Sequence, residues 1–262
     1  MLAHSRTGSG EPLFLVHGIT HRRQGWDPVI PLLDREHEVI AIDLPGHGES
    51  ADVDPGFDGS TRPLVEAVEG LASDLGIERP HIAGNSLGGL IALEMAARGS
   101  VRSATALSPA GFWSPVGRLW AKTLLGGSSK LLQSWSRERL DAVLGSKAGR
   151  HALLSALVAH PGRDHYAGMG DDLQGLARPR EGFATMLAAL DTWTAPRRSD
   201  VPTMVGWGAR DYLLPRVQIR RLRQVLPDAR VVVLPGCGHV PMADDPELTA
   251  ELILGTARLS RV

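Results

Sequence analysis

The fold of this chain is decided by residues 80–93, which read PHIAGNSLGGLIAL. A short apolar run ends at Gly84, Ser86 follows two residues later, and a helical pattern of apolar residues begins at once. Gly-x-Ser-x-Gly is the sequence form of a tight strand-to-helix turn known as a nucleophile elbow. The serine of such a turn has a strained backbone, so its neighbours two positions away must lack bulk, as Gly84 and Gly88 do. The pattern predicts that the Ser86 hydroxyl stands clear of the sheet, at the positive end of the following helix.

Short apolar runs alternate with helical patterns on both sides of this turn. Strands are expected at residues 12–16, 38–42, 81–83, 103–107, 203–207 and 231–234, and the first two read as buried. Helices are expected at 26–36, 63–75, 87–98, 216–226 and 247–258. Such alternation with short links predicts an α/β fold with a mostly parallel, doubly wound sheet. Functional groups in these sheets gather at the carboxyl ends of the strands.

The alternation is interrupted between Gly111 and Ala195. Helical patterns are found there at 116–125, 136–144, 150–159 and 182–192, with no run typical of a strand. Seven of the twelve Phe, Tyr and Trp residues fall in this stretch: Phe112, Trp113, Trp120, Trp135, Tyr166, Phe183 and Trp193. We therefore expect a core of residues 1–110 and 196–262 with an inserted helical subdomain, 111–195. Most of these aromatics should form the subdomain's own core, whereas Trp113, just after a strand end, is equally consistent with lining a substrate pocket.

The overall composition excludes several classes of function. With a net charge of −1 and a pI of about 6.8, the chain has no global field favouring nucleic acid or an anionic membrane. A basic group at Arg216, Arg220, Arg221 and Arg223 fits the solvated face of a surface helix. The N-terminus lacks the apolar region of a signal peptide, and no run reaches the roughly 18 to 20 apolar residues of a membrane span. We expect a cytoplasmic monomer or homodimer.

Two further strand ends carry polar residues in the order that completes a catalytic triad. Asp211 follows the strand at 203–207, and His239 follows the strand at 231–234. A serine hydroxyl needs an imidazole to take its proton during attack, and a carboxylate on the other ring nitrogen fixes the tautomer. The order Ser86, Asp211, His239 is therefore the predicted catalytic constellation.

The competing acids are less well placed. Asp200, Asp244 and Asp245 lie near the histidine or the acid in sequence but off a strand end. Asp43 is at a strand end but precedes the serine, and its loop is expected to bind its own backbone. The single cysteine, Cys237, is expected to be a small buried thiol.

An anionic tetrahedral intermediate needs hydrogen-bond donors. The N–H of Leu87, directly after the serine, is one predicted donor. The loop after the first buried strand, His17-Gly18-Ile19-Thr20, should supply the other, and we nominate the N–H of Ile19. His17 and His47 are expected to hydrogen-bond loop backbone.

Four sequence blocks together resemble the α/β-hydrolase superfamily in its capped form. They are VHGI at 16–19 with Trp26 downstream, DLPGHGES at 43–50, GNSLGG at 84–89, and WGARD at 207–211 with Gly238-His239. The resemblance implies that residues 111–195 form a cap over the site. The chain departs from the family at its start, because only about ten residues precede the first buried strand. Residues 2–6 are expected to form one strand of the usual N-terminal hairpin.

The expected activity is cofactor-independent hydrolysis of an ester or similar small apolar acyl compound through an acyl-enzyme, with no metal. A serine at the elbow argues against the aspartate-based route of dehalogenases and epoxide hydrolases. Carbon–carbon bond hydrolysis of a diketone-like ring-cleavage product is a close alternative, because GNSLGG resembles that subfamily, although its usual glycine-rich oxyanion loop is absent. A small-molecule receptor or a lyase reusing the same triad remains open.

Overall fold

The computed structural model describes residues 1–163, 165, 166, 170, 173, 181–196, 198, 199 and 201–261. Its centre is one seven-stranded sheet in the order β1-β3-β2-β4-β5-β6-β7. The strands are β1 His4–Thr7, β2 Glu11–Val16, β3 His37–Ile42, β4 His81–Asn85, β5 Ser103–Leu107, β6 Thr203–Gly208 and β7 Arg230–Leu234. All neighbours are parallel except β1 and β3. The mostly parallel α/β fold predicted from the sequence is confirmed.

The antiparallel edge is formed by β1, which pairs with β3 from His4 opposite Ile42 to Thr7 opposite Val39. One strand of the N-terminal hairpin is thus present, two residues further along than expected, and residues 1–3 form no strand. A hydrogen bond from the N–H of Asp43 to the carbonyl of Ala3 continues the pairing beyond the strand (2.9 Å).

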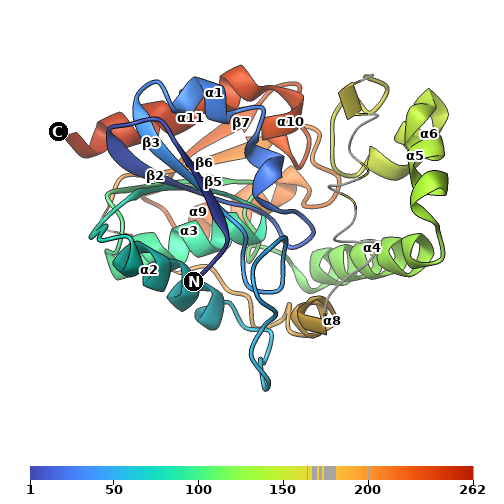
Figure 1. Cartoon of the computed structure of the whole chain (residues 1–262), viewed down its shortest axis with the longest axis horizontal. Coiled ribbons are helices and arrows are strands. Elements are labelled where there is room, and N and C mark those ends of the chain that lie inside the picture. The colour runs from blue at the N-terminus through green and yellow to red at the C-terminus, as the bar shows by residue number, and fades with distance from the viewer. Residues whose placement is uncertain are drawn as a thin grey trace.

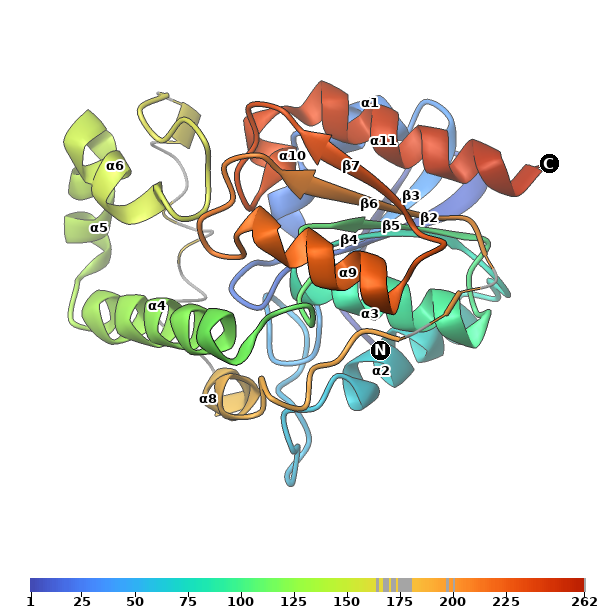
Figure 2. The same cartoon turned by 180° about the vertical axis from the view of Figure 1, so that it is seen from behind.

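Helices cover both faces of the sheet (Figures 1 and 2). They are α1 Ile30–Leu33, α10 Pro241–Asp244 and α11 Pro246–Arg258 on one side, and α2 Arg62–Asp74, α3 Leu87–Arg98 and α9 Ile219–Val225 on the other. The helix α3 packs against β4 and β5, directly behind the Gly84-x-Ser86 turn. The helix expected at 63–75 is confirmed as α2, and its apolar residues from Leu64 to Ala72 are buried. The strands β3, β4 and β5 are buried along nearly all their length, and Phe14 and Leu15 of β2 are fully inaccessible, whereas the edge strand β7 exposes Val232 and Val233.

One helix prediction was wrong. In place of a helix over 26–36, the structure has a 3₁₀ turn, η1 Arg23–Trp26, and the single helical turn α1. Two prolines account for the difference. Pro28 restricts the residue before it, and Pro31 has no N–H to continue a helical ladder. The apolar spacing marked burial correctly, because Trp26 and Leu33 are both inaccessible.

Between β5 and β6 the described residues form only helices and connections. The helices are α4 Pro115–Gln133, α5 Arg137–Gly145, α6 Lys147–Leu154 and α8 Glu181–Ala188. They lie beyond the carboxyl ends of the strands, apart from the helices that cover the sheet (Figure 2). Ser114, Ser136 and Ser146 accept a backbone N–H at the starts of α4, α5 and α6. We call residues 111–195 the helical segment.

The helix α4 is longer than predicted, because Gly126 and Gly127 lie inside it. A Cβ at Gly126 would lie 3.8 Å from Leu187 of α8, an ordinary contact distance, so α4 and α8 lie next to each other there. The remaining short helices are η3 Arg216–Gln218, which begins the predicted 216–226 helix, and η4 Leu259–Arg261. In the described part of the chain, no helix is both long enough and apolar enough to cross a bilayer.

Candidate active site

Ser86 occupies the sharp turn between β4 and α3, with φ 56° and ψ −112°. A positive φ is strained for a residue with a side chain, and strain of this kind is typical of functional turns. The flanking glycines make the turn possible. A Cβ on Gly84 would lie 2.1 Å from the carbonyl oxygen of Gly88, and one on Gly88 would lie 2.1 Å from that of Val16. The backbone therefore has the elbow conformation that the glycine spacing indicated.

Asp211 and His239 lie together at the ends of β6 and β7. The Nδ1 of His239 is 2.9 Å from Oδ2 of Asp211, and both residues are buried. The other oxygen of Asp211, Oδ1, accepts the N–H of Leu214 at 2.7 Å. Because a carboxylate only accepts hydrogen bonds, this contact places the ring proton on Nδ1 and leaves Nε2 of His239 free to act as a base.

Asn85 links the serine turn to the histidine loop. Its side-chain amide donates to the carbonyl oxygen of His239 at 2.8 Å and to that of Leu107 at 3.1 Å. The residue before Ser86 therefore fixes the backbone of His239. On the other side of the serine, a Cβ on Gly18 would lie 3.2 Å from Cβ of Ser86, so the loop after β2 passes close to the turn. The carboxyl ends of β2, β4, β6 and β7 therefore lie close together at one edge of the sheet.

The loop after β2 presents the predicted Ile19 amide. The N–H of His21 donates to the carbonyl of Gly18 at 3.0 Å, which closes a turn whose own hydrogen bond does not use the Ile19 N–H. The ring of His47 contacts the carbonyl oxygen of Ile19 through Nε2 at 2.7 Å. Leu87 is the first residue of α3, where an N–H has no helical partner. Both nominated donors therefore belong to backbone that is held in place and next to Ser86.

His17 holds the same loop through hydrogen bonds from its ring. Its Nε2 accepts the N–H of Leu44 at 3.0 Å, so its Nδ1 carries the proton and donates to the carbonyl of Gly18 at 2.7 Å. The expectation that His17 and His47 bond loop backbone is confirmed. Burial, with the neighbouring His47, lowers the pKa of His17 well below its ordinary value, so the ring is neutral at physiological pH.

Asp43 organises its own loop, as expected, and also makes an ion pair that the sequence did not indicate. Its carboxylate accepts the N–H of Glu49 at 3.0 Å and the N–H of Arg23 at 2.7 Å. It also pairs with the guanidinium of Arg23. A Cβ on Gly48 would collide with this carboxylate, which explains the glycine there. Asp43 is therefore fully engaged away from His239.

The structural role of Asp244, which the sequence analysis considered only as a competing acid, was not predicted. Its buried carboxylate accepts the N–H of Gly238 at 2.8 Å, the N–H of Ala159 at 2.9 Å and the hydroxyl of Tyr166 at 2.8 Å. It joins the loop of His239 to the helical segment. No local signal could have identified it, because the neighbouring Asp245 has the same chemistry. Asp245 caps α11 through the N–H of Leu248 at 3.0 Å.

Three other residues were indicated by the sequence: Trp113, Cys237 and Asp200. Trp113 is buried and stacks on Trp193, with ring centroids 6.2 Å apart, so its suggested role against substrate stays a prediction. Cys237 is buried, and that burial raises the pKa of its thiol to about 12, far from the range of a reactive thiolate. Asp200 lies outside the described residues.

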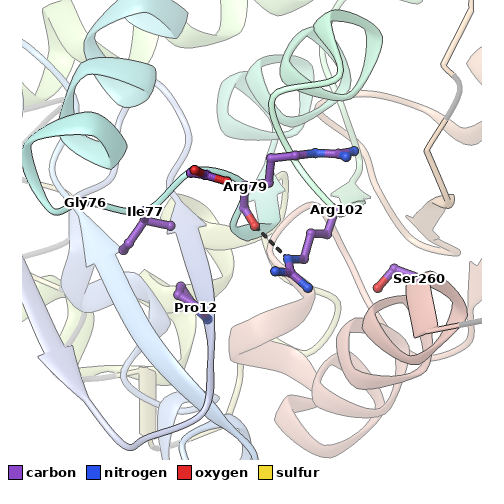
Figure 3. A pocket seen from close by; sticks show the side chains of 7 residues that line it. Pro12, Gly76, Ile77, Arg79, Arg102 and Ser260 are labelled. Carbon is purple, nitrogen blue, oxygen red and sulfur yellow. Dashed lines mark hydrogen bonds between the residues drawn. The ribbon is translucent and has the colours of Figure 1, made fainter.

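A pocket of about 500 Å³ lies at the opposite end of the sheet, lined by Pro12 near the start of β2 and by Arg102, which precedes β5 (Figure 3). The guanidinium of Arg102 is already engaged by protein groups. Arg102 donates from Nε to the carbonyl of Arg79 at 3.1 Å, and its Nη1 pairs with Glu11 at 3.0 Å. This pocket is remote from the carboxyl strand ends and plays no part in the candidate site.

Comparison with known proteins agrees with this geometry. A model of the alpha/beta hydrolase family matches residues 13–252. Lipase 1 of Psychrobacter immobilis is 26% identical over 256 residues, which span 93% of this chain and 75% of that protein.

Solved structures with a similar fold agree. A thermophilic esterase of Thermogutta terrifontis has a TM-score of 0.76 at 22% identity, covering 100% of this chain and 94% of the esterase chain. A meta-cleavage product hydrolase of Pseudomonas fluorescens has a TM-score of 0.75 at 20% identity, covering 99% and 94%. At these identities the two structures bear on the fold alone. A hydrolase function fits, and the chain belongs to the alpha/beta hydrolase family.

Proposed function

We propose that this protein is a cofactor-independent serine hydrolase that cleaves an ester or a similar small acyl compound. The observation that carries the proposal is the buried contact between Asp211 and His239 at 2.9 Å, on the same sheet edge as the strained turn of Ser86. Three groups of these types at the ends of β4, β6 and β7 have the roles that nucleophilic catalysis requires.

In this mechanism the hydroxyl oxygen of Ser86 attacks the substrate carbonyl while its proton passes to Nε2 of His239. Asp211 keeps the ring in the required tautomer and stabilises the imidazolium. The N–H groups of Ile19 and Leu87 stabilise the oxyanion of the tetrahedral intermediate. His239 then protonates the leaving alcohol, and an acyl group remains on Ser86. A water molecule, deprotonated by His239, releases the acid and restores the enzyme.

The acyl part of the substrate is proposed to be small and apolar. The helical segment lies beyond the strand ends, and five of its seven aromatic side chains are buried: Phe112, Trp113, Tyr166, Phe183 and Trp193. A helical segment of this composition favours the binding of apolar groups by burying them. Trp113 is the aromatic we assign to the substrate side, because it follows the end of β5 and its neighbour Phe112 packs on Trp207 of the core.

Covalent labelling tests the nucleophile. A serine-directed fluorophosphonate should add its mass to the peptide that contains Ser86, and Ser86→Ala should lower kcat for p-nitrophenyl esters by about 10⁴ to 10⁶. The circular dichroism spectrum of the variant should match that of the wild type, because the elbow backbone is set by glycines and not by the hydroxyl. A label on any other residue, or a variant within about tenfold of wild type, contradicts the assignment.

Carbon–carbon bond hydrolysis is the alternative that deserves a direct assay. It is supported by the GNSLGG form of the elbow and by the likeness in fold to a meta-cleavage product hydrolase. A vinylogous diketone assayed beside the ester series separates the two reactions. A higher kcat/KM for the diketone would replace the ester proposal and keep the triad. Turnover of neither, with Ser86 still labelled, would favour the receptor or lyase alternative.

A further inference from the structure

Large apolar side chains are exposed on one face at the start of α4. Val116, Leu119 and Trp120 of this helix are 78%, 64% and 48% exposed, and Tyr212 and Val217 are 58% and 61% exposed. These five are the majority of the nine exposed large apolar side chains among the described residues. Soluble proteins rarely gather such residues without an interaction to serve.

The five side chains belong to neighbouring elements. The indole Nε1 of Trp120 donates to the carbonyl oxygen of Tyr212 at 2.9 Å, which ties α4 to the loop after β6. A Cβ on Gly117 would lie 3.9 Å from the side-chain nitrogen of Gln218, the residue after Val217. The opposite stripe of α4, from Ala121 to Leu132, is buried against the rest of the segment. We call Val116, Leu119, Trp120, Tyr212 and Val217 the α4–Tyr212 face.

The two segments that carry this face contain charges of one sign only. Residues 111–133 contain Arg118, Lys122 and Lys130 and no carboxylate. Residues 212–227 contain Arg216, Arg220, Arg221 and Arg223 and again no carboxylate. The whole chain has a net charge of −1, so this excess of cations is local. The basic group that looked like an ordinary solvated helix face therefore borders an apolar surface.

This charge pattern favours one binding partner for the face over another. A second copy of the chain would use the same patch on both sides, as two-fold dimers do, and would bring cations against cations with no acid to pair them. An anionic lipid surface complements both properties, because basic side chains meet the headgroups while tryptophan, tyrosine and aliphatic side chains enter the interface.

We propose that the α4–Tyr212 face docks the protein reversibly on the surface of anionic lipid. Tyr212 directly follows Asp211, so docking would bring the membrane to the loop that carries the proposed catalytic acid, near an acyl compound dissolved in lipid. The inference does not depend on Ser86 being the nucleophile. It replaces the expectation, drawn from net charge, that the protein has no contact with membranes.

Sedimentation with vesicles tests this. The vesicles are made of ether-linked lipids, which offer no ester to hydrolyse, either phosphatidylcholine alone or with about one third phosphatidylserine. Wild-type protein should sediment with the anionic vesicles only and should be released by salt. Arg216→Gln with Arg220→Gln should weaken binding about 25-fold, since each basic residue near such a surface contributes about fivefold. Leu119→Ser with Val217→Ser should weaken it at least about tenfold through lost apolar burial.

Matched controls come from the α11 side of the sheet, opposite to α9. Val232→Ser in β7 and Arg258→Gln in α11 remove an exposed valine and an exposed arginine away from the face, and both should bind as the wild type does. The proposal is overturned by wild-type protein that binds neither vesicle or both equally, or by face variants that bind normally. It is also overturned if the wild type is a dimer that Leu119→Ser with Val217→Ser converts to monomer.

Discussion

The sheet core and the helical segment are held together in different ways. In the core, each proposed catalytic group stands at a strand end and is fixed by neighbouring backbone, as Asp211 is by the N–H of Leu214. The segment is tied to the core by hydrogen bonds between residues far apart in sequence. Ala159 bonds to Asp244, Trp193 to the carbonyl of Gly59, and Trp120 to that of Tyr212. The proposed chemistry therefore lies in the core, the proposed apolar contact with the acyl group lies in the segment, and the α4–Tyr212 face is formed by both.

The largest effect should come from the core. Asp211→Asn is expected to lower kcat on the order of 10⁴ at neutral pH, because an amide facing Nδ1 of His239 favours the wrong tautomer. Esterase assays on purified protein measure it. The same change at Asp245 is the control, since asparagine caps a helix as well as aspartate does, and kcat should stay within about tenfold. Equal losses in the two variants would mean that the acid is misassigned.

Asp244→Asn probes the connection between the two regions. The new amide nitrogen would face an N–H or hydroxyl that now donates to the carboxylate, and a buried donor left unsatisfied costs about 1–3 kcal/mol. We expect the free energy of unfolding to fall by about that amount, while kcat stays within about tenfold because Asp244 does not touch the His239 ring. Urea titration of the two adjacent variants measures the difference.

Asp245→Asn again serves as the control, with a loss of about 0.5 kcal/mol or less. Were Asp244→Asn as stable as Asp245→Asn, the hydrogen bonds to Ala159 and Tyr166 would not hold the segment to the core.

These variants also mark how far sequence reasoning reaches. The elbow was predictable because its cause is local: glycines two residues either side of Ser86 permit its φ of 56°. Order along the chain identified Asp211 and His239, and strand-end geometry explains why they meet. The roles of Asp244 were not predictable, because its partners Ala159 and Tyr166 are 85 and 78 residues away. The glycines inside α4 misled because each costs a helix only about 1 kcal/mol, which the rest of this 19-residue helix offsets.

His17 offers a smaller effect, confined to the core. Its pKa is lowered by burial, so the unfolded chain takes up a proton that the folded chain refuses as the pH falls below about 6.5. Stability from this residue is therefore present at higher pH and lost with decreasing pH, at up to about 1.4 kcal/mol per pH unit. His17→Gln keeps an acceptor for Leu44 and cannot titrate. Its free energy of unfolding, measured in urea between pH 8 and 5 (about the range where histidine titrates), should fall less steeply than that of the wild type. Parallel curves would exclude this linkage.

The smallest effect should come from the helical segment and concerns substrate choice. Each methylene that is buried contributes about 0.8 kcal/mol, so kcat/KM should rise roughly two- to fourfold per added carbon of the acyl chain. The rise must end when the pocket is full, because a longer chain clashes or protrudes into water. We expect a maximum at short to medium uncharged chains and low values for charged acyl groups.

Trp113→Ala should flatten this profile more than it lowers the maximum kcat, if its indole meets the acyl chain. Trp135, which is half-buried and lies under the guanidinium of Arg139, provides a matched control in the same segment. Trp135→Ala should leave the profile unchanged. A series of p-nitrophenyl esters of increasing length measures both variants beside the wild type. A flat profile in the wild type would show that the segment does not select by apolar burial. Its aromatics would then serve only its own packing and that of Trp113 on Trp193, and the substrate would have to be sought among polar compounds.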